Sequence, residues 1–477
     1  MVKQPVIVWF RQVMRLADHP ALLAAIATGQ PIVAVFVLDD QTPGPWKLGG
    51  ARRWWLHGSL EALSAALRKH NNHFVLRRGP AIDILPRLAN ETEATAIFAT
   101  RSTEPWARKL EANLQKALVA DEIAFKRYPG TLLFEPDTIT TQAGDPFKVF
   151  TPYWRAASQR DPRSPRRAPG KIPAPDRKVP SDDLKSWKLL PTHPDWAGGL
   201  RETWTPGEAA ATNLLRAFLY GPVTRYAADR DRPDIAGTSR LSPYLANGEI
   251  SPSTCWQAAH AHASGKGMDV FLKELVWREF SHHQLYHWPD LPDVAFRPEF
   301  SRFPWLKGKA ALRAWQTGLT GYPIVDAGMR QLRRTGWMHN RVRMVTASFL
   351  TKHLLLPWQQ GEAWFWDTLV DADLANNAAN WQWVAGSGAD AAPYFRIFNP
   401  VKQGETFDPR GSYVRQWAPE IAGLPDKFIH SPWTADDRAL HAAEITLGKT
   451  YPQPMVDHGG ARKRALEAFA SLKAAAE

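Results

Sequence analysis

Short apolar runs alternate with longer amphipathic stretches in the N-terminal part of the chain. Four apolar runs have the length of buried strands, at residues 5–10, 31–38, 74–76 and 96–99. Three stretches of helical character lie among them, at residues 21–27, 51–70 and 104–120. Strands that are apolar along their whole length are typical of a parallel sheet covered on both faces, and strand–helix alternation is typical of α/β folds. The pattern therefore predicts an N-terminal α/β domain with a parallel, Rossmann-like sheet.

The pattern becomes helical from about residue 206 to the C-terminus. Amphipathic stretches with helical periodicity occupy residues 206–228, 251–262, 270–287, 310–318, 325–335, 341–355, 363–369 and 460–476. Apolar residues at a spacing of three and four positions indicate helices that bury one face. The second half is therefore predicted to be an all-α domain.

Residues 160–180 separate the two patterns and contain six Pro and seven Lys or Arg. This composition cannot build a core and predicts a linker that runs over the surface. A chain of 477 residues also exceeds what one core usually holds. The predicted division is an α/β domain over residues 1–135, a linker over 136–205 and a helical domain over 206–477.

Residues 371–400 form the most unusual polar stretch, with three Asp, four Asn and two Trp. Asn competes for backbone hydrogen bonds and is a poor helix former. A core segment would not carry so many amides and carboxylates unless partners satisfied them. The stretch therefore predicts a polar wall around a large bound group that is partly aromatic.

One face of the predicted helix 270–287 carries Glu274, Trp277, Arg278 and Ser281, at the spacing i, i+3, i+4 and i+7. An ordinary solvated stripe with a Glu274–Arg278 pair is one interpretation. The Trp favours a binding surface instead, because it would otherwise expose a large apolar plane. From the spacing alone, both interpretations remain open.

Trp337, Asn340, Arg341 and Met344 repeat this spacing on a second predicted helix. Alone they would be an ordinary mixed helix surface, but two such faces predict a two-walled cavity. Its amide, indole, guanidinium and thioether groups are suited to stacking on a nucleobase and to bonding its edges. Arg343 lies to the side of this face.

Two further sets of residues allow a structural or a functional interpretation. For Arg343, Asp371 and Asp373 are possible partners, either as a buried ion pair or as a pair beside a cofactor. Residues 238–242 (TSRLS) place three hydroxyl groups and an Arg just before a helix. Such residues hold phosphate or simply cap the helix, and capping is the simpler interpretation.

Several common kinds of site are not expected. The first strand–helix turn has no glycine-rich loop, and the G-x-G-x-x-A match at 386–391 does not follow a strand. His282 and His283 are adjacent and cannot share a helix face, so no metal site is predicted. The lone Cys255 excludes an internal disulfide framework and a thiolate zinc cluster.

The overall composition gives indications about the binding partner and the cellular compartment. The net charge of +12 favours a polyanionic partner, usually nucleic acid. Ten of the 22 Trp lie between Trp277 and Trp383, which suggests stacking or electron transfer beyond packing. The sequence shows neither a long apolar run nor a cleavable leader, so we expect a cytoplasmic protein without membrane segments.

Together these motifs resemble the photolyase/cryptochrome family, and most closely its cyclobutane pyrimidine dimer (CPD) photolyases. The matching segments are residues 8–11 (VWFR), 237–242 (GTSRLS), 274–280 (ELVWREF), 321–328 (GYPIVDAG), 336–344 (GWMHNRVRM), 371–383 and 390–404. The resemblance implies an α/β domain, a long linker and an all-α domain that binds FAD. It covers nearly the whole chain.

The resemblance also implies roles for individual residues. FAD would be contacted by Tyr226, Thr238, Ser239, Arg240, Leu241, Ser242, Arg343, Asp371, Ala372, Asp373 and Asn377. The catalytic dimer pocket would be formed by Glu274, Trp277, Asn340 and Met344, with Asn377 facing the flavin N5. DNA would be met by Arg230, Glu274, Trp277, Arg278, Asn340, Arg341, Trp383 and Gln403. Electrons would reach the flavin through Trp305, Trp358 and Trp381.

The implied function is light-driven repair of pyrimidine dimers in DNA by a monomer, with electron transfer from excited, reduced FAD to a flipped-out dimer. The alternative is a cryptochrome-type photoreceptor that signals through a partner. Three positions favour repair: Asn340 and Met344, where a (6-4) photolyase would carry His, and Asn377, where plant cryptochromes carry Asp. A DNA-binding protein without chemistry is a third hypothesis.

The chain departs from the family pattern in two places. Val13 and Met14 replace the family's Asp-Leu in the first turn, a change for which we have no functional account. Residues 104–108 (EPWAR) lack the Asn-Glu pair of folate-binding forms. A second antenna chromophore would therefore be a deazaflavin (8-hydroxy-deazaflavin), a methenyltetrahydrofolate seated differently, or none.

Overall fold

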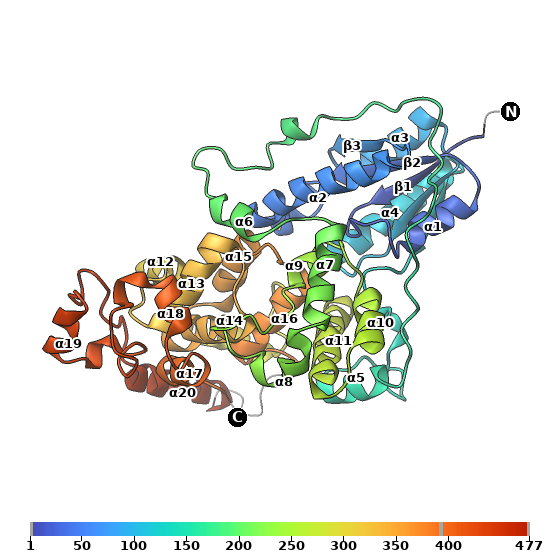
Figure 1. Cartoon of the computed structure of the whole chain (residues 1–477). Coiled ribbons are helices and arrows are strands. Elements are labelled where there is room, and N and C mark those ends of the chain that lie inside the picture. Colours follow the sequence, from blue (N-terminus) through green and yellow to red (C-terminus); the bar gives the residue numbers. More distant parts are fainter. Residues whose placement is uncertain (1–2, 391–394, 475–477) are drawn as a thin grey trace.

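The computed structural model of the chain describes residues 3–390 and 395–474 (Figure 1). Five parallel strands form one sheet in the order β3-β2-β1-β4-β5. Their bounds are Val6–Phe10 (β1), Ile32–Leu38 (β2), Phe74–Arg78 (β3), Ala96–Thr100 (β4) and Ala124–Tyr128 (β5). Val8 lies opposite Ala34 on one side and opposite Phe98 on the other. The predicted α/β fold is confirmed.

Helices cover both faces of the sheet, as the apolar strands predict. Helices α1 (Pro20–Ala27) and α2 (Gly50–Arg68) pack on one face, and α3 (Ala81–Thr92) and α4 (Pro105–Ala120) on the other. The sequence pattern missed α3 and β5. Helix α3 contains Pro86, and β5 is an edge strand whose Lys126 and Arg127 are exposed, so neither shows the pattern of a fully buried element.

The segment predicted as a linker is only partly irregular. It contains α5 (Phe150–Ala157), α6 (Gly198–Thr203) and the 3₁₀ turns Pro136–Thr138 and Leu184–Trp187. Residues 160–180 have no helix or strand and run along the outside of the α/β region (Figure 1). They are nevertheless held in place, because the Ile32 N–H donates to the Pro173 carbonyl at 2.8 Å.

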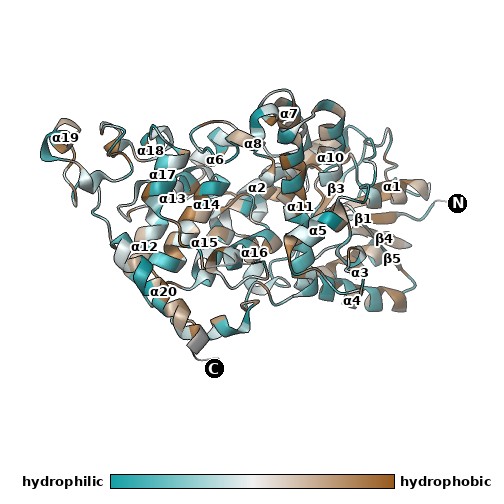
Figure 2. Cartoon of the chain, turned by 90° about the horizontal axis from the view of Figure 1, so that it is seen from below, coloured by the Kyte–Doolittle hydropathy of each residue, from teal (hydrophilic) through white to brown (hydrophobic). Residues whose placement is uncertain are grey.

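The second region is all helical, as predicted. Its helices are α7 (Glu208–Leu219), α8 (Tyr226–Asp229), α9 (Ser242–Ala246), α10 (Pro252–His262), α11 (Lys266–His287), α12 (Lys309–Thr317), α13 (Pro323–Thr335), α14 (Asn340–Ser348), α15 (Trp358–Thr368), α16 (Leu374–Ala385), α17 (Pro400–Phe407), α18 (Ser412–Trp417), α19 (Asp437–Ala442) and α20 (His458–Ala474). Short 3₁₀ turns of this region occupy Pro222–Arg225, Pro298–Arg302, Pro419–Ile421 and Pro432–Thr434, and another, Gly44–Trp46, lies before α2 in the α/β region. Most helices carry both hydrophobic and hydrophilic residues (Figure 2), the pattern of helices half-buried against a core.

Three predicted helices differ from those observed. The stretch 206–228 divides into α7, a 3₁₀ turn and α8, because Gly221 and Pro222 end α7. The stretch 341–355 ends as an α-helix at Ser348 and continues as a π-helix over Phe349–His353. The predicted helix 460–476 corresponds to α20, and its last two residues lie outside the described residues.

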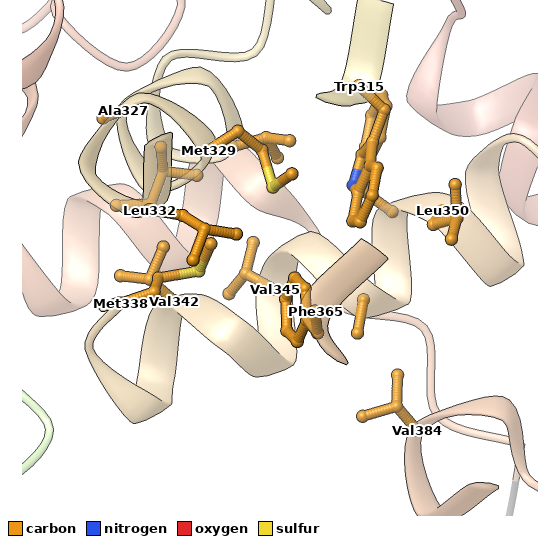
Figure 3. Close-up of a cluster of buried hydrophobic side chains, with 14 of the residues drawn as sticks. Trp315, Ala327, Met329, Leu332, Met338, Val342, Val345, Leu350, Phe365 and Val384 are labelled. Carbon is orange, nitrogen blue, oxygen red and sulfur yellow. The ribbon is translucent and has the colours of Figure 1, made fainter. Parts of the chain in front are cut away.

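The main core lies between α12, α13, α14, α15 and α16. In Figure 3 the side chains of Trp315, Met329, Leu332, Val345 and Phe365 turn toward one another. No helix in the described ranges, 3–390 and 395–474, is long and apolar enough to cross a membrane.

The two regions are packed together through α2 and α15. The Gly50 N–H donates to Asp367 Oδ1 at 2.8 Å, and the Trp366 indole donates to the Lys47 carbonyl at 2.8 Å. The buried guanidinium of Arg15 donates to the Gly248 carbonyl at 2.9 Å. These contacts place the α/β region against the helices that carry the predicted site.

Candidate functional site

The amide-rich stretch forms helix α16, which the sequence did not predict. Asp373 caps this helix, because its carboxylate accepts from the Asn376 N–H at 2.9 Å and from the Asn376 side chain at 2.8 Å. The buried Gln382 donates to the Leu291 and Val294 carbonyls at 2.6 and 2.8 Å. Several of the polar groups therefore hold the fold together. Residues 391–394 of the family motif lie outside the described residues.

Arg343 and Asp371 form the predicted pair at the start of this stretch. Arg343 Nη2 lies 2.8 Å from Asp371 Oδ2, and the Asp371 side chain is 2% exposed. Arg343 Nε also donates to the Met338 carbonyl at 2.8 Å, which fixes the guanidinium. Asp371 Oδ1 is buried without a partner among the described residues, so one carboxylate oxygen is free to accept a hydrogen bond from a bound group.

Asn377 lies one turn into α16 and is buried. Its Nδ2 donates to the backbone oxygen of Glu362 on α15 at 3.0 Å. The backbone oxygen of Ala372 accepts from Arg52, the third residue after the cap of α2 at the N-terminal end of that helix. The α/β region therefore contributes an arginine contact to the backbone of the predicted flavin-facing stretch.

Asp373 does not pair with Arg343, although the sequence allowed that. Its Oδ2 lies 3.2 Å from His282 Nε2, and His282 Nδ1 lies 2.8 Å from the Thr103 hydroxyl of the α/β region. Burial works against an ionised Asp373, but His282 and the Asn376 N–H outweigh it and lower the pKa of the carboxyl. Asp373 therefore belongs to the seam between the two regions, which encloses a cavity of about 40 Å³ there.

Three carboxyl groups in this seam bind protons more tightly than usual. Burial raises the pKa of Glu104 to about 7, that of Glu279 to about 7 and that of Glu249 to about 8. Glu249 accepts from the Trp55 indole at 3.1 Å and from the Ser59 hydroxyl at 2.6 Å, both on α2. Of the three, Glu249 bonds directly across the seam, and its raised pKa favours the neutral acid at pH 7.

Glu274 and Trp277 lie on one face of α11, as the spacing predicts. Glu274 does not pair with Arg278 but with Arg230, which follows α8. Trp277 stacks on Phe150, with ring planes 7° apart and centroids separated by 3.4 Å. Phe150 was not predicted to belong to the site; its only signal in the sequence is the aromatic segment 147–154 (FKVFTPYW).

Arg278 lies toward the seam rather than beside Glu274. Its Nη1 donates to the Thr131 carbonyl at 3.0 Å and lies 3.2 Å from Glu279 Oε1, and its side chain is 13% exposed. Ser281 is buried and donates to the Trp277 carbonyl. Of the two interpretations left open by the sequence, the solvated stripe with a Glu274–Arg278 pair is therefore wrong. A contact of Arg278 with DNA stays a prediction.

Helix α14 presents Asn340 and Met344, but Trp337 lies before it. His339 caps the helix, so the predicted helical spacing from Trp337 is wrong. Asn340 is exposed and Met344 is half-buried. Arg341 Nη2 pairs with Asp231 at 2.8 Å, and its guanidinium lies 4.4 Å from the Phe407 ring centroid.

Helices α11 and α14 both pack against α16. The residues predicted for the dimer pocket are therefore carried by two helices that pack against the helix with the residues predicted for the flavin. The two-walled cavity itself stays a prediction.

Tyr226 and residues 238–242 lie near α8 and α9. Tyr226 is buried against Phe218, and burial raises the pKa of its phenol. The hydroxyl groups do not cap α9, whose cap residue is Leu241; the Ser239 hydroxyl accepts from the Leu241 N–H, and the Ser242 hydroxyl accepts from Trp337 at 3.2 Å. Arg240 has a positive φ of 51° and lies over the Trp204 ring at 4.4 Å. Thr238 is half-buried.

The three predicted relay tryptophans belong to the main core or its edge. Trp381 and Trp358 are buried, and Trp305 is half-buried against the same core. A Cβ at Gly361 would lie 2.1 Å from Trp381 Cη2, and Gly361 is three residues from Trp358 on α15. Trp381 therefore lies on the helix face that carries Trp358. The Leu306 N–H donates to the Leu355 carbonyl at 2.7 Å, which places Trp305 near the start of α15.

Trp383 is half-buried on α16, and Gln403 lies on α17. Within residues 3–390 and 395–474, the buried polar atoms without a hydrogen-bond partner include Asp371 Oδ1, Trp381 Nε1, Gln403 Oε1, Arg240 Nε and Arg341 Nε of the predicted site residues. Others lie elsewhere, such as Trp9 Nε1 and Asn72 Oδ1 in the α/β region. The unpaired atoms of the site residues are available to hydrogen-bond a bound group. No cluster of three His, Cys, Asp or Glu suited to a metal ion occurs in the part of the chain that is described.

Comparison with known proteins gives matches over nearly the whole chain. Residues 6–174 match the DNA photolyase domain, and residues 271–471 match the FAD binding domain of DNA photolyase. A deoxyribodipyrimidine photo-lyase of Agrobacterium fabrum is 49% identical, with 98% of each chain covered. Cryptochrome-1 of Arabidopsis thaliana is 36% identical over 98% of this chain and 70% of its own length.

Solved structures agree with this result. The crystal structure of a bacterial class III photolyase from Agrobacterium tumefaciens has a TM-score of 0.96 and 48% identity, covering 99% of this chain and 98% of that one. An archaeal photolyase from Sulfolobus tokodaii with two FAD molecules has a TM-score of 0.83 and 28% identity, covering 98% of this chain and 100% of that one.

Proposed function

Because the chain belongs to the DNA photolyase family, we propose that it repairs cyclobutane pyrimidine dimers in DNA with light absorbed by bound FAD. The observation that carries the proposal is the placement of α11 and α14 against α16. Glu274, Trp277, Asn340 and Met344 then border the pocket for the dimer, and Asn377 lies at the flavin.

FAD would be held by the pair of Arg343 and Asp371, by residues 238–242 and by Tyr226. The unpaired Asp371 Oδ1 and Arg240 Nε supply an acceptor and a donor for it. When bound, reduced FAD supplies the electron that opens the cyclobutane ring on illumination and takes it back afterwards. The protein contributes position and electrostatics.

The dimer would leave the duplex and enter the pocket at low cost, because a lesion is already poorly stacked and paired. Trp277, backed by Phe150, offers a rigid plane for the flipped bases. Trp383 offers a second aromatic surface. Glu274, held by Arg230, would bond the thymine carbonyl edges and stabilise the charge that develops on them.

The DNA backbone would lie along the basic and polar residues around this pocket. These are Arg230 after α8, Arg341 on α14 and Gln403 on α17, with Arg278 as a further proposed contact. Arg341 carries a carboxylate partner, Asp231, so phosphate binding there would exchange one anionic partner for another. Binding driven by phosphate contacts weakens as salt rises.

The second candidate is a photoreceptor that signals through a partner. The similarity to Cryptochrome-1 of Arabidopsis thaliana favours it. Asn377 favours repair, because the resemblance places Asp there in plant cryptochromes. Both candidates would use Trp305, Trp358 and Trp381 to bring electrons to the flavin.

A second chromophore is a separate question. The Sulfolobus tokodaii photolyase is described with two FAD molecules and a novel light-harvesting cofactor. For this chain, methenyltetrahydrofolate, 8-hydroxy-deazaflavin and a second FAD are the candidate antennas, which extraction of the purified protein would distinguish.

The test is illumination of the purified, reduced protein with an oligonucleotide that contains one thymine dimer. Repair restores the absorbance of intact thymines, and a dark sample is the control. A yellow protein that completes a photocycle and repairs nothing would support the photoreceptor instead. A colourless protein with no flavin absorbance would contradict both.

A further inference from the structure

Glu362 on α15 is a buried acid without a partner. Its side chain is 0% exposed, and neither carboxyl oxygen makes a hydrogen bond to any of the described residues. A buried carboxylate in that state is far less stable than the neutral acid. Burial, and then the nearby charge of Asp293, raise the pKa of Glu362 well above its ordinary value. At neutral pH this residue therefore holds a proton.

Glu362 is also the residue that orients Asn377. Its backbone oxygen can only accept a hydrogen bond, so the atom of Asn377 that lies 3.0 Å away must be the amide nitrogen Nδ2. Asn377 Oδ1 then turns the other way and makes no hydrogen bond within the described residues. Asn377 therefore presents an acceptor oxygen, Oδ1, to the predicted flavin edge. Such an oxygen can accept a hydrogen bond from a flavin nitrogen that carries a hydrogen.

Asp293 is an exposed acid whose charge acts on Glu362. It lies in the loop after α11. The neighbouring Leu291 and Val294 carbonyls accept from Gln382, so this loop rests on α16. Glu362 therefore has an exposed acid in its electrostatic surroundings and Asn377 bonded to its backbone oxygen.

We propose that Glu362 is the proton donor of the flavin site and supplies the proton taken up at the edge that Asn377 faces. The inference rests on the proposed function, because it requires FAD in this site. Electrons would come one at a time from an external thiol through the tryptophan relay; two thiol molecules each give up one electron and one proton to solvent, and their sulfurs join as one disulfide. With bound FAD, the Glu362 O–H bond would break as an N–H bond forms at flavin N5, and the carboxylate would regain its proton from water.

Time-resolved infrared spectroscopy of the flavin-loaded protein, illuminated with a thiol present, tests this. The wild type should lose a carboxylic-acid C=O band as the flavin is protonated and then regain it. Glu362→Gln keeps the shape but has no acidic proton, so it should lack this band change and protonate the flavin at least about tenfold more slowly. Glu362→Asp keeps the acid and should restore the band change.

The matched control is Glu249→Gln, which removes another buried neutral acid that has no place in the predicted site. It should lower the static carboxylic-acid absorbance and leave the light-induced change intact. A band change that persists in Glu362→Gln, or a yellow wild type with no band change, would overturn the inference alone. A colourless wild type would overturn the proposed function and the inference with it.

Discussion

Two buried glutamates, Glu111 in the α/β region and Glu362 in the helical region, differ in whether the fold gives their carboxyl groups partners. In the α/β region, Glu111 is 2% exposed and accepts from Arg11, from Arg127 at 2.9 Å and from the Ser102 N–H at 3.1 Å. In the helical region, Glu362 is equally buried and has no partner for either oxygen. The carboxylate of Glu111 is balanced by two guanidinium groups of its own region, whereas Glu362 has no such partner among the described residues. If the proposed function holds, the unpaired acid serves the site around α16, and the paired acid serves only stability.

The largest expected effect follows from removing the partnered acid. Glu111→Ala leaves Arg11 and Arg127 without their carboxylate, and breaking a buried ion pair costs about 3–5 kcal/mol. Glu362→Gln should change the free energy of unfolding by less than about 1 kcal/mol, because a neutral group replaces a neutral group. Urea unfolding measures both. Glu91→Ala removes a more exposed partner of Arg77 and serves as the control. Equal losses of unfolding free energy in the two variants would contradict the proposed difference between Glu111 and Glu362.

The pH dependence of stability probes the seam between the regions. The pKa of Glu249 is about 8 in the folded protein and about 4.5 in the unfolded chain. Between these values the folded state keeps a proton that the unfolded chain has released, so stability falls as pH rises from about 4.5 to about 8. At about 1.4 kcal/mol per pKa unit, the loss is at most on the order of 5 kcal/mol.

Glu249→Gln should flatten this decline, so its stability relative to wild type should increase with pH. Unfolding curves recorded across this range measure the difference. Glu61→Gln changes an exposed acid on α2 and should follow the wild type. A Glu249→Gln protein with the wild-type slope would show that Glu249 is ionised in the fold.

A single added methyl group, in Gly361→Ala, should lower the stability of the core around the predicted tryptophan relay. In Gly361→Ala the new Cβ would overlap the Trp381 ring, and such overpacking costs about 1–3 kcal/mol. Because Trp381 must move, photoreduction of the flavin should slow while repair by chemically reduced protein continues. Trp305→Phe leaves that contact intact and should block photoreduction by removing the proposed outer member of the relay. Normal photoreduction in both variants would place the relay elsewhere.

The sequence predicted the contacts that lie close along the chain or repeat with a simple period. Apolar runs located β1 to β4, and the family motifs paired Arg343 with Asp371. Helix α16 was not predicted because Asn is a poor helix former. In the structure, however, the Asp373 carboxylate caps the helix by accepting from the N–H and the side chain of Asn376. The Glu274–Arg230 pair and the Phe150–Trp277 stack were missed because each joins segments far apart in the sequence. The spacing of residues along one segment does not predict contacts between distant segments. These two contacts form because α5 and α8 pack on α11.

The smallest effect on stability, and the sharpest on function, is expected at Glu274. The carboxylate is 30% exposed and its partner Arg230 is 22% exposed, so Glu274→Ala should cost no more than about 1 kcal/mol of unfolding free energy. FAD absorbance should stay at the wild-type level, because Glu274 lies on the wall predicted for the dimer. The yield of repaired thymine dimers per absorbed photon should fall, because the charge that develops on the dimer loses its stabilising group. Glu274→Gln keeps a hydrogen-bonding side chain and should recover part of that yield. An unchanged yield in Glu274→Ala would show that Glu274 serves only to hold Arg230. The role of this part of α11 would then be structural rather than catalytic.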